Sequence, residues 1–260
     1  CTFICEHGSL YGIVSSRIDE NGFERKRNFM IQISNLSKKY GETVVFSDLN
    51  YTFENTCIYG LVGRNGAGKT TLLNILSNYD KNYTGVISID GEKMNKVDYL
   101  DMPVAYAMDQ PSFFNELTIY ENLLLIASSR KIKKQEAFDK IERILDGLGL
   151  KKYENYSPLE LSKGTMQRLN NACAMIQEEK ITIFDEPFSG LDPVQMKLLE
   201  NVIVEFHKKE KGIYIISSHD IECLQNVCDK CLLLHNGQIR EINTEEVDRE
   251  KIAKILSEGE

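Results

Sequence analysis

Apolar and polar positions divide the chain into alternating strand-like and helix-like segments. Three short, almost entirely apolar runs are typical of strands buried on both faces: residues 56–62, 181–184 and 213–217. Other segments place apolar residues at helical spacing and predict helices over residues 69–77, 118–129 and 135–148. Because strands alternate with helices in this way, we expect an α/β fold with a mostly parallel sheet.

Two further segments depart from this alternation. Met30 opens a strand through residues 31–33, a turn and a second strand follow, and Asp90-Gly91 is a turn signal inside a hairpin-like pair. These segments predict an antiparallel β subdomain. Residues 112 to about 165 predict an inserted helical subdomain. We therefore expect one domain over residues 30–245, an N-terminal extension of unknown role over 1–29, and a C-terminal tail over 246–260.

Composition and charge narrow the functional classes. The 260 residues are 42% hydrophobic and 27% charged, as in an ordinary soluble globular protein. A net charge of -8 and a pI of about 5.2 argue against nucleic acid as a partner. No apolar run approaches the ~18 residues of a spanning helix, and the first residues lack the apolar core of a secretion signal. We therefore expect a cytoplasmic protein that contacts a membrane only through a partner.

The seven cysteines favour reduced thiols over a disulfide framework in a chain of this size. Cys223, Cys228 and Cys231 have the C-x4-C-x2-C spacing that also occurs in plant-type iron–sulfur ligation, although a fourth thiolate would have to come from elsewhere. Residues 220–226 resemble a helix and residues 230–235 a buried strand. Core packing is therefore the preferred interpretation of these cysteines.

A Gly-rich segment between the strand at 56–62 and the helix at 69–77 predicts a phosphate-binding loop. It matches G-x-x-x-x-G-K-[ST] and consists of Gly63, Arg64, Asn65, Gly66, Ala67, Gly68, Lys69 and Thr70, with Thr71 after it. The glycines let backbone N–H groups converge on phosphate oxygens, and the helix that follows points its positive end at them. Lys69 is expected to reach the β- and γ-phosphates of ATP, and Thr70 to hold Mg²⁺. The segment indicates a P-loop NTPase core.

Two acids at the end of the strand over 181–184 predict the chemistry of hydrolysis. Asp185 lies where an acid of the Mg²⁺ shell is expected, and Glu186 beside it can polarise an attacking water. A strand that simply ends in a charged turn is the alternative, and the P-loop upstream disfavours it.

With these motifs, the chain resembles the nucleotide-binding subunit of an ABC transporter over residues 31 to about 240. The segment Leu161-Ser162-Lys163-Gly164-Thr165, followed by Gln167-Arg168, resembles the family signature LSGGQ, and Ser189-Gly190-Leu191-Asp192 resembles the D-loop. His219 resembles the switch histidine, and Tyr40 stands where the family places an aromatic that stacks on adenine. Without the resemblance, Tyr40 reads as a surface aromatic and His219 as a structural histidine.

The resemblance implies a mechanism, cofactors and partners. Two such domains, in a homodimer or with a related chain, would dimerise head to tail around Mg²⁺ and ATP. Ser162 and the Gly164 backbone would then meet the γ-phosphate from across the interface, and a monomer would lack these contacts. A separate membrane-spanning permease would receive the motion through the helical segment at 112–165, at the inner face of the cell membrane.

The chain departs from the family pattern in two places. Lys163 and Thr165 replace the usual Gly and Gln of the signature, while Ser162 and Gly164 are retained. The family's Q-loop glutamine lies nine positions before the threonine that corresponds to Thr118; this position holds Asp109, and the glutamine is its neighbour, Gln110. Either the loop shifts by one residue or Asp109 takes the role near Mg²⁺.

An ATPase subunit of an exporter is the favoured role. The LSKG signature resembles that of single-domain ATPases in bacterial antibiotic and peptide exporters. Little sequence follows the last predicted strand, whereas importer ATPases often carry a longer C-terminal regulatory domain. A small-solute importer ATPase is the first alternative. The second is a soluble ABC-type ATPase acting on ribosomes or DNA, which the acidic charge disfavours.

Overall fold

A six-stranded, mostly parallel sheet forms the centre of the molecule. The structure is a computed structural model that describes residues 29–54, 56–94, 97, 102–219 and 221–242; the predicted tail, and the predicted extension apart from Phe29, lie outside the described residues. The sheet has the order β10-β9-β3-β8-β7-β6. Its strands are β3 (Cys57–Val62), β6 (Val104–Ala107), β7 (Ile181–Phe184), β8 (Ile213–Ser218), β9 (Lys230–His235) and β10 (Gln238–Ile242).

Burial on both faces explains the apolar runs of this sheet. Every residue of β3, β7 and β8 is buried, and these strands pair in parallel with their neighbours. Only β9 and β10 pair antiparallel. The α/β class and the mostly parallel sheet are therefore confirmed. Parallel pairing also brings the carboxyl ends of β3, β7 and β8 to one edge, where the predicted motifs begin.

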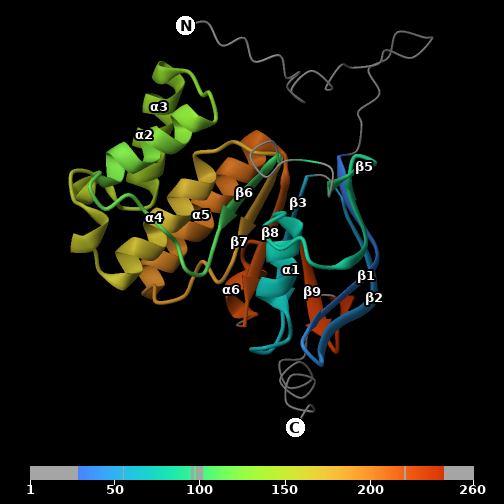
Figure 1. Cartoon of the computed structure of the whole chain (residues 1–260). Helices are drawn as coiled ribbons and strands as arrows, with labels where there is room; N and C mark the ends of the chain where they lie inside the picture. The colour runs from blue at the N-terminus through green and yellow to red at the C-terminus, as the bar shows by residue number, and fades with distance from the viewer. Residues whose placement is uncertain (1–28, 55, 95–96, 98–101, 220, 243–260) are drawn as a thin grey trace, which may run out of the picture.

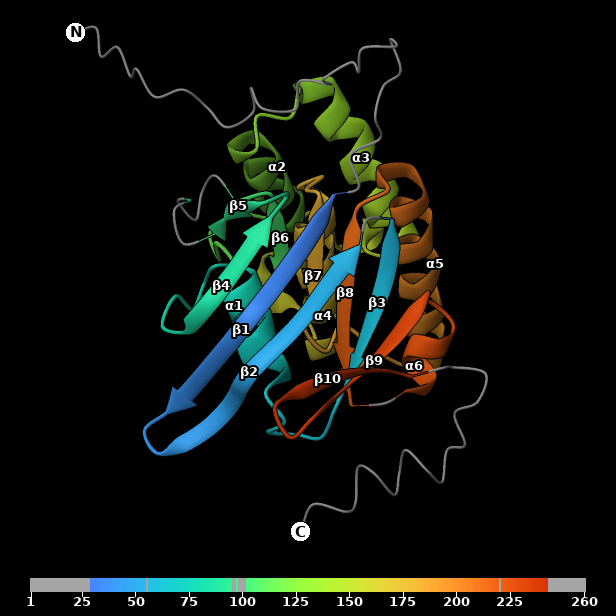
Figure 2. The ribbon, with the colours of Figure 1, turned by 90° about the vertical axis from the view of Figure 1, so that its right-hand side faces the viewer.

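A second sheet is antiparallel throughout. It has the order β2-β1-β4-β5, with β1 (Met30–Tyr40), β2 (Thr43–Glu54), β4 (Thr84–Ile89) and β5 (Glu92–Lys93). The predicted turn joins β4 to β5, and Asp90 and Gly91 have φ of 52 and 84, the left-handed pair that a tight hairpin requires. Figure 2 shows β1, β2 and β4 crossing in front of the parallel sheet.

Helix α1 packs on one face of the parallel sheet with the antiparallel sheet, and helices α2 to α5 pack on the other face (Figure 1). Their bounds are α1 (Lys69–Leu76), α2 (Ile119–Ser129), α3 (Lys134–Gly147), α4 (Lys163–Met175), α5 (Pro193–Glu210) and α6 (Glu222–Gln225), with 3-10 turns η4 (Lys151–Tyr153) and η5 (Pro158–Glu160). Thr118 caps α2 in a capping box with Glu121. The helix predicted over 220–226 is shorter than expected, and Asp220 lies outside the described residues.

Two apolar clusters, one on each face of the parallel sheet, hold these layers together. Ile58 and Val62 of β3 face the cluster built with α2 to α5, whereas Tyr59 and Leu61 face the cluster built with α1 and the antiparallel sheet. Successive residues of a strand point to opposite faces, so one strand serves both clusters. Of the helices in the described part of the chain, none combines the length and apolarity needed to cross a bilayer.

Candidate active site

The P-loop joins the end of β3 to the start of α1. Gly68 is the N-cap of α1, with a φ of 99 and no side-chain cap. A Cβ at Gly68 would lie 2.7 Å from a methyl carbon of Val45, so both the backbone angle and the space require glycine. The N–H groups of the first helical turn have no intrahelical partner. The start of a helix is a place where proteins can bind an anion.

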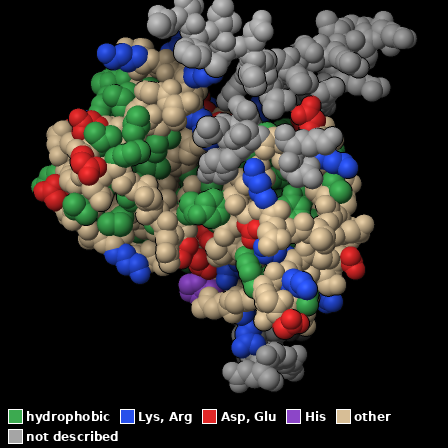
Figure 3. Space-filling view, in the orientation of Figure 1, with side chains coloured by type: hydrophobic (Ala, Val, Ile, Leu, Met, Phe, Trp, Pro, Cys, Tyr) green, Lys and Arg blue, Asp and Glu red, His purple; other side chains and the backbone are tan. Residues whose placement is uncertain are grey.

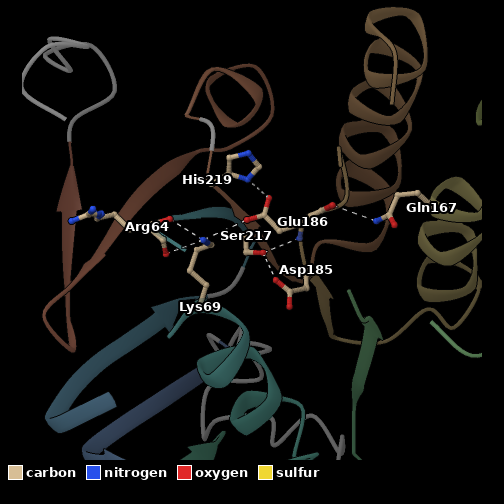
Figure 4. A network of polar contacts seen from close by, with 8 residues as sticks. Arg64, Lys69, Gln167, Asp185, Glu186, Ser217 and His219 are labelled. Atoms are coloured by element: carbon tan, nitrogen blue, oxygen red, sulfur yellow. Dashed lines mark hydrogen bonds and ion pairs between the residues drawn. The ribbon is translucent and has the colours of Figure 1, made fainter. Parts of the chain in front are cut away.

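Lys69 is held at the base of this loop. Its side chain is 7% exposed, and Nζ donates to the carbonyl oxygens of Gly63 at 2.8 Å and Arg64 at 3.4 Å. The same ammonium lies 3.4 Å from Oε1 of Glu186. Figure 4 shows the Arg64 side chain pointing away from this contact. Two carbonyl oxygens and one carboxylate thus hold the Lys69 ammonium against the P-loop.

Asp185 is fully buried at the carboxyl end of β7. Ser217 Oγ donates to Oδ1 at 2.5 Å, while Oδ2 has no hydrogen-bond partner in the described part of the chain. Burial raises the pKa of the Asp185 carboxyl, although the hydroxyls of Ser217 and Thr70 act against it. The negative charges of Asp109 and Glu186 raise this pKa further. A buried carboxylate with an oxygen that no hydrogen bond occupies can serve as one ligand of a divalent cation such as Mg²⁺.

Glu186 occupies the centre of the polar network in Figure 4. Its Oε2 lies 2.9 Å from Nδ1 of His219, and its Oε1 faces Lys69. The His219 side chain is 60% exposed and that of Glu186 is 18% exposed, so the carboxylate lies at the boundary between protein and solvent. Glu186 also has a φ of 48, a left-handed conformation that is unfavourable for a non-glycine residue. Contacts with surrounding residues have to hold glutamate in this conformation.

Ser217 was not among the predicted site residues. Its hydroxyl donates to Asp185 and accepts the backbone N–H of Glu186 at 2.9 Å, so one side chain joins both acids. The signal in the sequence is slight: a hydroxyl near the end of an otherwise apolar buried strand, two residues before His219.

Asp109 and Gln110 follow β6 at the same edge of the sheet. The charge of Asp109 acts on the Asp185 carboxyl, and Asn170 of α4 donates to the carbonyl of the preceding Met108 at 2.7 Å. Both Asp109 and Gln110 are exposed. The negative charge of Asp109 is therefore close enough to raise the pKa of the Asp185 carboxyl.

The signature residues have local roles at the start of α4. Ser162 is the N-cap of α4, and its hydroxyl accepts from Thr165 N at 3.3 Å. A Cβ at Gly164 would lie 2.9 Å from the Gly190 carbonyl, so the signature packs on the D-loop of the same chain. Asp192 caps α5 by accepting from Gln195 N at 2.9 Å. Among the described residues, Ser162, Gly164 and Asp192 make no hydrogen bond or ion pair with the network around Glu186.

Tyr40 is the last residue of β1, in the antiparallel sheet. It pairs with Thr43, two residues before the Val45 side chain that contacts Gly68. The ring is 53% exposed; its hydroxyl donates to Asp80 at 3.1 Å, and the Lys38 ammonium lies 4.6 Å from the ring centroid. One face of the ring therefore has a cation partner.

The remaining P-loop positions lie between the end of β3 and the first turn of α1. Asn65 and Gly66 are exposed, Ala67 N donates to Arg64 O at 3.1 Å, and Thr70 and Thr71 lie in the first turn of α1.

The cysteines that the structure describes lie in or against the core rather than in this site. Cys223 and Cys231 belong to the apolar cluster on the helical side, and burial raises the pKa of Cys231 to about 11. Within the described ranges, no group of three or more His, Cys, Asp or Glu side chains is arranged to hold a metal ion.

Fold and site together define a P-loop nucleotide-binding protein. Residues 46–189 match the family described as ABC transporter. The bacitracin transport ATP-binding protein BcrA of Enterococcus faecalis is 30% identical over 223 residues, 85% of this chain and 71% of BcrA. The tungstate uptake system ATP-binding protein TupC of Peptoclostridium acidaminophilum is 30% identical over 211 residues, 81% of this chain and 97% of TupC.

Solved structures agree with this match. The structure of an ATP-binding subunit of an ABC transporter has a TM-score of 0.77 at 26% identity, covering 87% of this chain and 97% of its own. A dimeric bacterial ABC transporter cassette has the same fold, with a TM-score of 0.73 at 22% identity over 82% of this chain and 98% of its own. The chain belongs to the ABC transporter family as an ATP-binding subunit, and it is an ABC-type ATPase.

Proposed function

We propose that the P-loop network binds ATP with Mg²⁺ and hydrolyses it to drive transport through a separate permease. The observation that carries this proposal is the meeting of Lys69, Asp185, Glu186 and His219 at one edge of the sheet. The loop N–H groups would hold the phosphates, and Lys69 would balance their charge. Thr70 and Oδ2 of Asp185 would hold the magnesium ion, which when bound supplies charge neutralisation at the β- and γ-phosphates.

Glu186 is the general base of this proposal. Its carboxylate accepts the proton of the water that attacks the γ-phosphorus, while the bond to the leaving oxygen of ADP breaks. His219 donates to Oε2 and so orients the carboxylate. Oε1, which faces Lys69, is the oxygen that a water would approach when the lysine turns to the phosphates.

A second copy, or a related chain, would complete the site. Ser162 and Gly164 lie at the start of α4, outside the network around Lys69, although the resemblance assigns them to the γ-phosphate. A head-to-tail dimer resolves this, because the signature of one subunit then faces the P-loop of the other. A cassette with the same fold is dimeric, which supports a dimer here.

The helical segment over residues 112–165 supplies a surface for a membrane-spanning partner. Its side chains include large exposed apolar residues: Phe114, Leu125, Phe138, Tyr156 and Leu159. Figure 3 shows hydrophobic side chains gathered on this part of the molecule. The chain would then act as a peripheral subunit at the cytoplasmic face of the cell membrane.

Export is the direction that we propose. The LSKG signature and the similarity to a bacitracin transport protein support it. Import is the second candidate, because the tungstate uptake protein is equally similar in identity.

Dilution tests the composite site directly. Because each site needs two subunits, phosphate release per molecule at saturating ATP should fall as the chain is diluted about a hundredfold into the range where dimers dissociate. A flat specific activity, with sedimentation showing monomers at the lowest concentration, would contradict the dimer.

Direction is tested by co-expressing the chain with the polytopic protein that co-purifies with it from membranes. Raised tolerance of the host to peptide antibiotics, lost with Glu186→Gln, would support export. ATP-dependent accumulation of tungstate would support import instead.

A further inference from the structure

The strained backbone at Glu186 is held by side chains of α4, the helix that begins at the signature. The left-handed φ of 48 at Glu186 is not a local preference of glutamate. A residue stays in such a conformation only where surrounding contacts outweigh the strain. The contacts around the Glu186–Pro187 peptide therefore identify what keeps the acid in place.

Two of these contacts come from amide side chains on α4. Gln167 Nε2 donates to the Glu186 carbonyl at 3.3 Å, and Asn171 Nδ2 donates to the Pro187 carbonyl at 3.2 Å. The residues are four positions apart, which places them on the same face of the helix. Figure 4 shows Gln167 reaching Glu186 from the side opposite Lys69.

Asn171 has no other evident reason to be polar. It is 0% exposed, it lies inside a helix where asparagine is a poor former, and its Oδ1 has no partner in the described residues. The bond to the Pro187 carbonyl is the contact that its amide makes. A buried amide with one bond, aimed at the residue after Glu186, points to a positioning role rather than to packing.

We infer that Gln167 and Asn171 are positioning residues, which hold the left-handed backbone of Glu186 and so aim its carboxylate between Lys69 and His219. Ser217 fixes the N–H side of Glu186 at 2.9 Å, and the two α4 amides fix the carbonyl side of the same turn. Because α4 begins at Ser162, any displacement of the signature helix moves these anchors as well. The inference rests on the proposed role of Glu186 as the base.

The test separates the rate of hydrolysis from the binding of ATP. In Asn171→Ala, Asn171→Leu and Gln167→Met, the turnover number should fall roughly 10- to 100-fold, because a small misplacement of a catalytic group has effects of this size. The dissociation constant for Mg-ATP should stay within about twofold of wild type, since the P-loop is untouched. Asn171→Leu keeps the number and branching of the side-chain heavy atoms and leaves no cavity, so it covers the case in which Asn171→Ala fails to fold.

Asn78→Ala is the matched control. Asn78 is 1% exposed, donates to the Val97 carbonyl at 3.1 Å and also has an Oδ1 without a described partner, but it follows α1 and is remote from Glu186. Its variant should lose at least as much thermal stability, because Asn78 has a φ of 62, which alanine tolerates less well than asparagine. It should retain the wild-type turnover number. Equal losses of turnover in Asn78→Ala and Asn171→Ala would overturn the inference, because a general loss of stability would then explain both.

A double-mutant cycle sharpens the test. In a Glu186→Gln background, Asn171→Ala should change the residual rate by less than about twofold, because the carboxylate that it positions is already absent. The same fold-loss in both backgrounds, or a wild-type rate in all three α4 variants, would overturn the inference alone. A wild-type rate in Glu186→Gln itself would overturn the proposed base, and the inference with it.

Discussion

The two halves of the proposed composite site differ in how they are built. The P-loop half consists of side chains that are distant in the sequence and come from the start of α1, the end of β7 and β8. These side chains, Lys69, Asp185, Glu186 and Ser217, form a connected network of contacts in or near the core. The signature half consists of helix caps, with Ser162 and Asp192 bonded to backbone N–H groups three residues on. The first half is preorganised by the sheet and includes a bare buried oxygen and a strained residue. The second half is stabilised by local hydrogen bonds, and its capping residues Ser162 and Asp192 are exposed to solvent.

The largest expected effect is in the P-loop half. Glu186→Gln keeps the shape of the side chain and removes the base, so hydrolysis should fall roughly 10²- to 10⁴-fold. Mg-ATP binding should survive, and ATP that is not consumed should favour the dimer. Phosphate release, titration calorimetry, and light scattering with and without ATP measure the three consequences. An unchanged mass on adding ATP would count against the closed dimer.

Removal of the lysine should weaken binding rather than chemistry alone. In Lys69→Ala, affinity for Mg-ATP should fall roughly 10- to 100-fold, the value of a charged hydrogen bond to phosphate. Titration calorimetry checks this, and Lys81→Ala, which removes an exposed lysine of the loop after α1, serves as the charge-matched control. Wild-type affinity in Lys69→Ala would mean that ATP binds elsewhere.

A smaller effect is expected in the signature half. Ser162→Ala removes a helix cap and should lower stability by about 1 kcal/mol. It should also lower the rate about tenfold at protein concentrations that favour dimers, because a hydrogen bond to the γ-phosphate is lost. Ser157→Ala removes the cap of η5, where Ser157 accepts from Leu159 N at 3.3 Å, and controls for stability. Equal rates in the two variants would make Ser162 only a cap.

The smallest effect is on the stability of the resting protein. Burial raises the pKa of Asp185, so the folded state binds this proton more tightly than the unfolded state does. Stability should therefore fall as pH rises from the unfolded pKa of an aspartate to the raised folded value. Asp185→Asn removes this penalty and should stabilise the magnesium-free protein by roughly 0.5–2 kcal/mol at neutral pH. Thermal melts across this pH range check it; a variant less stable at every pH would contradict it.

Local rules and long-range contacts differ in what the sequence could predict. The strand and helix on either side of the P-loop, the hairpin at Asp90-Gly91 and the start of α2 near Thr118 depend on neighbours in the chain, and the structure confirms them. The end of α6 is less well predicted, because a helix as short as Glu222–Gln225 depends on packing rather than on propensity.

The arrangement around the acids could not be predicted in the same way. Ser217 joins Asp185 and Glu186 from a strand more than thirty residues away, and Asn171 reaches Pro187 across the packing of α4 on the sheet. The left-handed turn at Glu186 follows from these contacts and not from the residue itself. The sequence leaves open whether Asp109 or Gln110 has the Q-loop role. The influence of the Asp109 charge on the pKa of Asp185 depends on the fold and could not be read from the sequence.

The ion pair between Lys69 and Glu186 has a kinetic consequence. At 3.4 Å the ammonium is already occupied, so an arriving nucleotide has to compete with a protein carboxylate for it. Association should therefore be slower than diffusion and should quicken in Glu186→Gln, where the amide carries no charge to hold the lysine. The ion pair would then slow the entry of nucleotide. Stopped-flow mixing with a fluorescent ATP analogue would detect its loss in Glu186→Gln as a rise in the association rate constant.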